Sequence, residues 1–206
     1  RNVDAIIFDK TGTLTKGEFG VTDIIVFGSL EESEILQKAA SLERDSEHSI
    51  AEGIVNAAED RELEFLPVSD FNALPGKGIE GKIDSQKYLV VSENYMQEQG
   101  FEYDETRVKE IAKQGKTVVF LIKNENVLGA IGLADIIREE SKETISALQQ
   151  MGIKCMMLTG DNDQVAKSVA TELGLDEYFA EVLPDEKAAK IKEVQSKYTV
   201  AMVGDG

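Results

Sequence analysis

Four short polar clusters in this chain each follow an apolar run, and each holds residues suited to handling phosphate. The stretch DKTGTLT, which begins at Asp9, follows the run AIIF, and TGDN follows CMML. LPDEK comes after YFAEV, and GDG comes after TVAMV. An aspartate carboxylate can attack phosphorus and form an aspartyl phosphate. Any single cluster can be explained as a turn or a helix cap, but four of them need a common explanation.

The residue types in these clusters complement one another in phosphoryl transfer. Thr159 and the Gly160 amide, at a predicted helix start, suit phosphate oxygens. Lys187 offers a positive charge to the transferring group. Asp205 can give a carboxylate to Mg²⁺, which takes one or two carboxylates together with phosphate oxygens and water. We therefore predict that Asp9 is the nucleophile of a site that positions and neutralises a phosphoryl group.

The elements that must position these clusters alternate between strand and helix in the C-terminal third. KCMML and TVAMV are typical of buried strands, and helical apolar spacing occurs in EESKETISALQQMG, DQVAKSVATELGL and DEKAAKIKEVQSK. The first of these helices is expected to place Ile145, Leu148 and Met151 on its apolar stripe, with Gly152 as its stop. This alternation predicts a parallel sheet, and ligands bind at the carboxyl ends of the strands of such a sheet.

The middle of the chain has a different pattern. Two predicted helices, SEILQKAASLER and HSIAEGIVNAAED, precede short strands with Gly- and Asn-rich turns: VSDFNAL, GIEGKID, KYLVVS, TVVFLIK and VLGAIGL. Such a series predicts an antiparallel α+β domain inserted into the α/β domain. We expect the α/β domain to comprise residues 1–19 and 134–206, and the inserted domain residues 20–133.

Composition narrows the possible partners. The 206 residues include 22 basic and 39 acidic side chains, and the net charge of −17 disfavours nucleic acid as a partner. No apolar run approaches the ~20 residues that span a bilayer, and no apolar leader follows Arg1, so we expect a soluble piece. Cys155, within CMML, is expected to be a small core residue.

DKTGTLT, TGDN, PDEK and MVGDG, in this order, resemble the phosphorylation domain of P-type ATPases, a branch of the haloacid-dehalogenase superfamily. The resemblance covers essentially the whole chain, and it implies a Rossmann-type parallel sheet. It also implies that ATP phosphorylates Asp9 and that Lys187 stabilises the phosphoryl group. The site residues that it implies are Lys10 and Thr11 in the catalytic loop, Thr159, Gly160 and Asp161 around the phosphate, and Asp9, the Thr11 carbonyl and Asp205 around Mg²⁺.

The residue two positions after the nucleophile separates pumps from phosphatases. Soluble phosphatases of the superfamily carry an aspartate there as general acid and base. This chain has Thr11, which cannot readily activate water for attack on an acyl phosphate. The phosphoenzyme is therefore expected to persist, as a pump cycle requires.

Two stretches of the inserted domain, DSEHSI and PGKGIEG, are weak signals when taken singly. A lone histidine at a helix start is usually unremarkable, and GIEGKI has the pattern of a strand, so a dinucleotide fold is unsupported. Together they resemble the nucleotide domain of heavy-metal-transporting P-type ATPases, where Ser-Glu-His-Pro contacts adenine and the glycines admit the nucleotide. Ser49 stands where the family usually has proline. The ATP-binding residues implied are Glu47, His48, Gly76, Gly78, Asn94 and Asp135.

The resemblance extends to the predicted hinge between the domains and to the C-terminal end of the chain. Asp135 and Arg138, in LADIIREES, resemble the hinge-region pair of the family. The chain ends at Gly206, where the family continues with an Asn-Asp pair, so we expect a fragment that retains nucleotide binding better than phosphorylation. Its implied partners are the transmembrane and actuator domains of the same pump, and its implied place is the cytoplasmic face of the membrane.

Three functional hypotheses remain open on the sequence. GIKCMMLTGDN and AEVLPDEK look most like copper-exporting pumps, which favours an ATP-binding and phosphorylation region of such a pump. The second hypothesis is a soluble phosphatase of the same superfamily with an elaborate cap domain. The third is a non-catalytic module that senses ATP.

Overall fold

The computed structural model describes residues 3–204 and divides the chain into two compact units. The first unit is made of Arg1–Glu18 with Asp135–Gly206, and the second of Phe19–Ala134. Two long strands, β2 (Thr15–Val26) and β7 (Asn126–Ile137), contain the crossings between the units.

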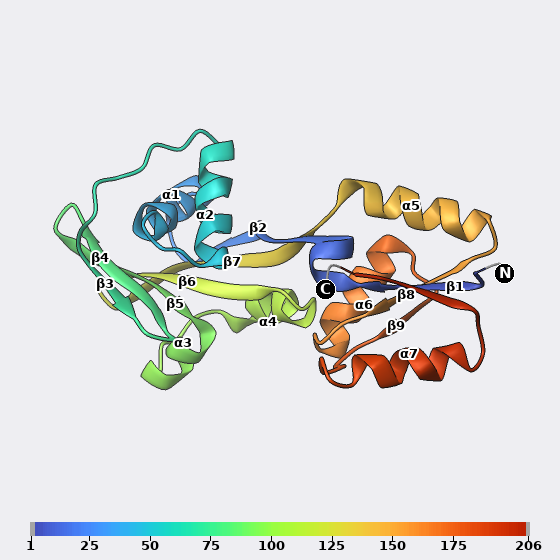
Figure 1. The fold of residues 1–206 in the computed structure, drawn as a ribbon. Coiled ribbons are helices and arrows are strands. Elements are labelled where there is room, and N and C mark those ends of the chain that lie inside the picture. The colour runs from blue at the N-terminus through green and yellow to red at the C-terminus, as the bar shows by residue number, and fades with distance from the viewer. Residues whose placement is uncertain (1–2, 205–206) are drawn as a thin grey trace. The chain divides into compact units, whose positions relative to one another are not determined.

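The first unit is a four-stranded parallel sheet with helices on both faces (Figure 1). In sheet order its strands are β10 (Val200–Val203), β1 (Ala5–Asp9), β8 (Lys154–Leu158) and β9 (Glu177–Phe179). Its helices are α5 (Glu139–Gln150), α6 (Asp163–Leu173) and α7 (Lys187–Gln195). The predicted α/β class is confirmed.

Alternate residues of the central strands face two separate cores in this unit, because successive side chains of a strand point to opposite faces. Phe8 and Met157 pack in the core that contains Ile145 of α5, whereas Ile7 packs in the core that contains Val194 of α7. Strands buried on both faces explain why the sequence runs AIIF and CMML carry no polar residue.

The predicted core position of Cys155 is confirmed. The side chain is fully buried, and its burial raises the pKa of the thiol to about 11. Because the thiolate is the reactive form, this cysteine is a packing residue and a poor nucleophile.

The prediction that Met151 lies on the apolar stripe of its helix is wrong. Helix α5 ends at Gln150, and Gly152 then turns the chain with a φ of +81°. Met151 is therefore past the last helical turn, and it is 74% exposed.

The second unit is a six-stranded sheet with two helices on each face (Figure 1). The sheet order is β2, β7, β6 (Thr117–Lys123), β5 (Gln86–Ser92), β4 (Gly78–Ile83) and β3 (Ser69–Leu74), and every pairing from β7 to β3 is antiparallel. Helices α1 (Glu32–Glu43) and α2 (Ser49–Asp60) cover one face, and α3 (Glu93–Gln99) and α4 (Glu105–Lys113) cover the other.

Strand β6 shows how the sequence builds this double-sided core. Leu121 packs with Ile54 in the core under α1 and α2, while Phe120 packs with Met96 and Ile111 in the core under α3 and α4. The helices α3 and α4 were not predicted, because each is short and has few apolar residues.

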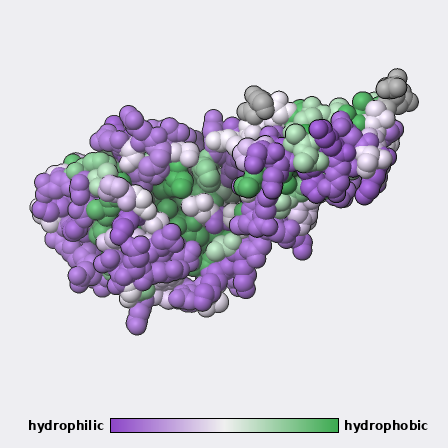
Figure 2. All heavy atoms as spheres, turned by 60° about the horizontal axis from the view of Figure 1, so that its bottom comes forward, coloured by the Kyte–Doolittle hydropathy of each residue, from purple (hydrophilic) through white to green (hydrophobic). Residues whose placement is uncertain are grey.

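Hydrophilic residues cover most of the face of the molecule in Figure 2, in keeping with a charged fraction of 30%. Within residues 3–204 the structure contains no helix with the length and apolar character needed to cross a bilayer.

Candidate functional site

The register of the parallel sheet brings three of the four polar clusters together around Asp9. Asp9 ends β1 opposite Leu158 of β8, and Phe8 pairs with Val203 of β10 on the other side. The chain beyond β10 passes close by, since an ideal Cβ on Gly204 would lie 3.4 Å from the Asp9 Cβ. Asp205, the predicted Mg²⁺ ligand, lies outside the described residues.

Lys187, the first residue of α7, brings the fourth cluster to the same place. Its Nζ donates hydrogen bonds to Oδ1 and Oδ2 of Asp9 at 2.9 and 2.7 Å. The Asp9 side chain is only 17% exposed, so solvent screens this ion pair less than it screens a surface pair. The structure thus places a cation directly on the predicted nucleophile.

Lys10 is a buried cation that holds two carboxylates. Its Nζ lies 3.2 Å from Asp135 Oδ2 and 2.9 Å from Asp161 Oδ2. The Lys10 side chain is 6% exposed, and its ammonium group is already paired with these two carboxylates. Lys10 therefore acts as a positioning residue. It links the loop after β1 to the loop after β8 and to the end of β7.

The TGDN cluster divides its polar groups between capping and site construction. Asn162 caps α6, its Oδ1 accepting from the Val165 amide at 3.0 Å, and this leaves Asp161 free to pair with Lys10. The Thr159 hydroxyl donates to Asp161 Oδ2 at 2.9 Å and accepts from the Asp161 amide at 3.1 Å. Gly160 is exposed, with only the Val182 carbonyl near an ideal Cβ, so its backbone is open to an approaching anion.

Asp135 and Arg138, the predicted hinge pair, fix the loop between Lys10 and Thr15. The Arg138 guanidinium donates to the carbonyls of Gly12 at 3.0 Å and Thr15 at 3.2 Å. Asp135 accepts from the Thr15 hydroxyl at 2.6 Å and the Gly17 amide at 3.1 Å. Between these anchors Gly12 has a φ of +80°, which glycine adopts without strain. Asp135 was predicted to bind ATP, and in the structure its carboxylate is occupied by this loop.

Thr11, which occupies the general acid–base position, is exposed in the same loop and carries no carboxylate. Within residues 3–204, no three His, Cys, Asp or Glu side chains are grouped to hold a metal ion. Asp9 offers one carboxylate, and the predicted set of carboxylates with a backbone carbonyl suits Mg²⁺ better than a transition metal.

The second unit contains an apolar pocket of about 660 Å³, within the usual size range of ligand sites. It includes four of the predicted ATP-binding residues: Glu47, His48, Gly76 and Gly78. Its walls are the α1–α2 connection, the β3–β4 hairpin, and parts of β5 and β6. Asn94, also predicted to bind ATP, is exposed on the first turn of α3 and does not line this pocket.

His48 joins this pocket to helix α2. Its Nδ1 accepts from the Ala51 amide at 3.2 Å, so the imidazole is the N-cap of the helix and carries its proton on Nε2. That Nε2 lies 3.6 Å from Glu43 Oε2. Ser49 is the first residue of α2, the position at which proline is favoured. Compared with the proline usual in the family, serine makes the backbone less rigid there and costs the helix no hydrogen bond.

Glu43 is a candidate site residue that the sequence analysis did not identify. Its side chain is 3% exposed, and burial raises the pKa of its carboxyl group. In the described part of the chain, Glu43 Oε2 and Ser46 Oγ are the buried side-chain atoms without a hydrogen-bond partner, and both residues line the pocket. The Ser46 hydroxyl and His48 lie close enough to Glu43 to oppose part of this pKa increase, so the three residues form one polar group in the pocket. Buried polar atoms that lack a partner are costly, which makes Glu43 and Ser46 candidate ligand contacts. A glutamate on the buried side of α1, five residues before His48, was the available signal.

Two glycines of strand β4, Gly78 and Gly81, have no room for a side chain. Gly78 has a φ of +142°, and an ideal Cβ there would lie 2.1 Å from the Val90 carbonyl oxygen. A Cβ on Gly81 would meet Leu42 of α1 at 2.9 Å. The stretch forms a hairpin and the strand β4, in agreement with the strand pattern of GIEGKI.

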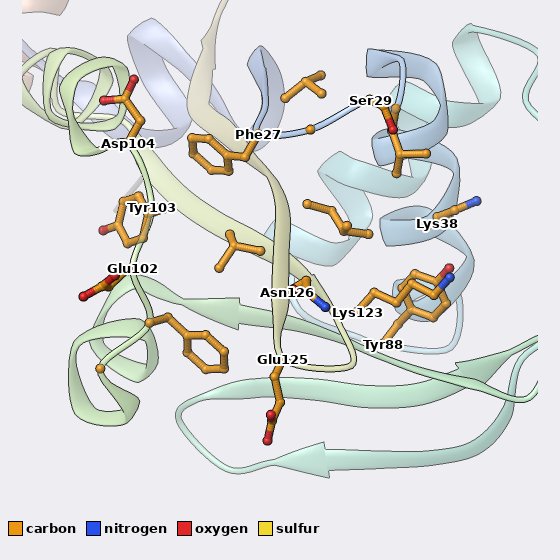
Figure 3. Close-up of a pocket in the computed structure, with 17 residues that line it drawn as sticks. Phe27, Ser29, Lys38, Tyr88, Glu102, Tyr103, Asp104, Lys123, Glu125 and Asn126 are labelled. Carbon is orange, nitrogen blue, oxygen red and sulfur yellow. The ribbon is translucent and has the colours of Figure 1, made fainter.

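A larger open hollow of about 1300 Å³ lies elsewhere in the second unit and contains none of the predicted site residues. In Figure 3, Lys38, Lys123 and Tyr88 gather at one end of it, while Phe27 and Tyr103 lie at the other, near two acidic side chains. Its charges of both signs define no single class of ligand, and the apolar pocket remains the candidate binding site.

Comparison with known proteins identifies the family. The model of haloacid dehalogenase-like hydrolases matches residues 3–206. The chain is 60% identical over 206 residues to a copper-exporting P-type ATPase B of Archaeoglobus fulgidus, and it is 41% identical to a copper-transporting P-type ATPase of Rhizobium leguminosarum. These matches cover 100% and 98% of this chain but only 30% and 24% of the relatives, so the chain spans less than a third of their length.

Solved structures agree with this relationship. A zinc-transporting PIB-type ATPase in an E2.Pi state matches with a TM-score of 0.91 and 37% identity, over 99% of this chain and 33% of that chain. The catalytic domain of a CPx-ATPase, described as CopB-B, matches with a TM-score of 0.68 and 30% identity, over 99% of this chain and 72% of that one. The chain belongs to the haloacid dehalogenase-like hydrolases and, within them, to the P-type ATPases.

Proposed function

We propose that this chain is the ATP-binding and phosphorylation region of a heavy-metal-transporting P-type ATPase, and that copper is the transported ion. The observation that carries the proposal is the double hydrogen bond from Lys187 to Asp9 at the end of β1. It supplies a nucleophile and a neutralising cation in one place. The choice of copper rests on the relatives from Archaeoglobus and Rhizobium, whose names specify copper.

In the proposed reaction a carboxylate oxygen of Asp9 attacks the γ-phosphorus of ATP. A new oxygen–phosphorus bond forms, the bond between the γ-phosphorus and the bridging oxygen breaks, and ADP leaves with that electron pair. Lys187 moves from the carboxylate to the phosphoryl oxygens and balances their charge. The Gly160 backbone, beside the Thr159–Asp161 hydrogen bonds, lines the phosphate.

Mg²⁺ would supply further positive charge to the phosphate oxygens, held by the Asp9 carboxylate, the Thr11 carbonyl and Asp205. The inclusion of Asp205 rests on its place in the MVGDG motif, since this residue lies outside the part of the chain that the structure describes.

In the second unit, the pocket that contains Glu43 and His48 would bind the adenine base. The unpaired Oε2 of Glu43 can accept a hydrogen bond from the exocyclic amino group, and Ile79 and Val90 offer apolar surface to the ring. Both the deep carboxylate and the apolar walls fit an aminopurine better than a small phosphate ester.

The remaining parts of the proposal concern the whole protein. Transmembrane and actuator domains of the same pump would be the partners of this region, at the cytoplasmic face of the membrane. The absence of a carboxylate at Thr11 supports a lasting aspartyl phosphate, which such partners need, and disfavours a soluble phosphatase.

The test is to trap the phosphoenzyme of the full-length protein with ATP labelled at the γ-phosphate. We expect acid-stable, hydroxylamine-labile label in the wild type and none in Asp9→Asn. Label that survives Asp9→Asn would overturn the proposed nucleophile. Rapid hydrolysis of small phosphate esters without a trapped intermediate would instead favour the phosphatase.

A further inference from the structure

The apolar pocket has an electrostatic imbalance that a nucleotide must overcome. Three carboxylates line it, those of Glu43, Asp45 and Glu47. Among the lining residues, all within the described part of the chain, Lys77 is the only lysine or arginine. A phosphate chain entering this pocket therefore meets an acidic surface with a single ammonium group.

The backbone of Lys77 is fixed at the turn between β3 and β4. Its amide donates to the Leu74 carbonyl at 2.9 Å, and its own carbonyl accepts from the Ser92 amide at 2.9 Å. Gly76 and Gly78 flank it with φ values of +71° and +142°. The position of the Lys77 Cα is thus determined by the hairpin, while its side chain remains 45% exposed and can move.

In the structure the ammonium group of Lys77 is engaged by α3. Its Nζ donates to Glu98 Oε2 at 2.6 Å, and Glu98 is 54% exposed and does not line the pocket. Ser92 connects the β3–β4 turn to α3. Its amide donates to the Lys77 carbonyl, and its hydroxyl caps α3 by accepting from the Tyr95 amide at 3.4 Å. An exposed ion pair of this kind contributes little to stability, so a phosphate with several charged oxygens can displace Glu98.

We propose that Lys77 binds the phosphate groups of the nucleotide, and that Glu98 competes with them for the same ammonium group. This inference rests on the proposed function, because it requires a nucleotide in the pocket. In the free chain Lys77 is held by Glu98. On binding, the ammonium leaves Glu98 and pairs with a phosphate, while the base stays with Glu43 and His48.

The test is calorimetric titration of this 206-residue chain with ATP and with adenosine, in the presence of a chelator. We expect Lys77→Ala to lower the affinity for ATP about tenfold, the effect of one charged hydrogen bond, and to leave adenosine binding unchanged. Lys77→Arg should retain ATP binding. Glu98→Gln should raise the affinity for ATP, because the competitor of the phosphate loses its charge.

Lys82→Ala is the matched control, since Lys82 is similarly exposed, pairs with Asp70 at 2.7 Å and does not line the pocket. It removes the same charge from the same unit and should change neither titration. Equal ATP affinity in Lys77→Ala and Lys82→Ala would overturn the inference while leaving the proposed function intact. Equal losses for ATP and adenosine in Lys77→Ala would also overturn it, as a purely structural effect. A wild-type chain that binds neither ligand would overturn the proposed function and this inference with it.

Discussion

The ammonium group of Lys187 lies 2.9 and 2.7 Å from the two carboxylate oxygens of Asp9, although 178 positions separate the two residues in the chain. One comes from the end of β1 and the other from the start of α7. In the proposed reaction, this ion pair neutralises the Asp9 carboxylate before attack and provides a cation for the phosphoryl group afterwards.

Replacing Lys187 by alanine should therefore slow phosphoenzyme formation. We expect a loss of roughly 10²–10³-fold in the full-length protein, the usual effect of removing one preorganised electrostatic group. The measurement is the initial rate of label incorporation from ATP. Lys190→Ala, on the same helix, pairs with Glu193 instead and should retain the wild-type rate. A normal rate in Lys187→Ala would contradict the role assigned to this lysine.

Lys10, although next to Asp9 in the chain, should contribute mainly to the stability of the fold. Lys10→Ala removes the cation that Asp135 and Asp161 share, and breaking the buried pair with Asp135 typically costs about 3 kcal/mol or more. Urea denaturation of the chain measures the change. A variant as stable as wild type would show that water replaces Lys10 without penalty.

His48 has two separable roles, as helix cap and as pocket residue. His48→Ala should weaken ATP binding and should also cost about 1 kcal/mol of stability through the lost cap of α2. His48→Asn restores a capping side chain but does not restore the imidazole. We expect thermal unfolding to recover in His48→Asn and the ATP affinity to remain low. Recovery of both would reduce His48 to a structural residue.

Glu43 should make stability depend on pH. Because its pKa is raised in the folded chain above the ordinary value of 4.5, the folded state keeps the proton to higher pH than the unfolded state does. The free energy of unfolding therefore falls as pH rises through this window. Glu43→Gln removes the buried charge, so its stability advantage over the wild type should be absent below pH 4.5 and should grow as the pH rises towards neutral.

Denaturation curves at several pH values measure this difference, with the exposed Glu59→Gln as control. A difference that does not change with pH would mean that Glu43 titrates normally. We also expect Glu43→Gln to weaken ATP binding, so that stability and affinity change in opposite directions.

The glycines of the hairpin should differ sharply in their tolerance of alanine. Gly78→Ala places a Cβ 2.1 Å from the Val90 carbonyl oxygen, and we expect a loss of about 3 kcal/mol or more. Gly76 has open space around it, so Gly76→Ala should cost only the strain of a φ of +71°, about 1 kcal/mol. Equal stabilities of the two variants in urea would contradict the close approach of β4 to β5.

Much of the phosphoryl site could be predicted from the order of motifs along the chain. Parallel strands end at one edge of a sheet, so clusters that follow AIIF, CMML and TVAMV had to meet there. The antiparallel pattern of the middle segment could be predicted equally well, because strands of 6 or 7 residues with glycine turns recur at short intervals.

What the tertiary structure decided was which partner each polar group takes. Asp161 could have capped α6, but Asn162 does so, and Asp161 pairs with Lys10. Asp135 was predicted to bind ATP, and in the structure its carboxylate accepts hydrogen bonds from Lys10, Thr15 and Gly17. Glu43 was not singled out in the sequence, and the structure buries it on α1 beside His48. A sequence shows the residue types that meet at a sheet edge or on a helix face, but hydrogen-bond partners are chosen by distances of a few ångströms. Those distances are set only when the hydrophobic cores of the two units have packed.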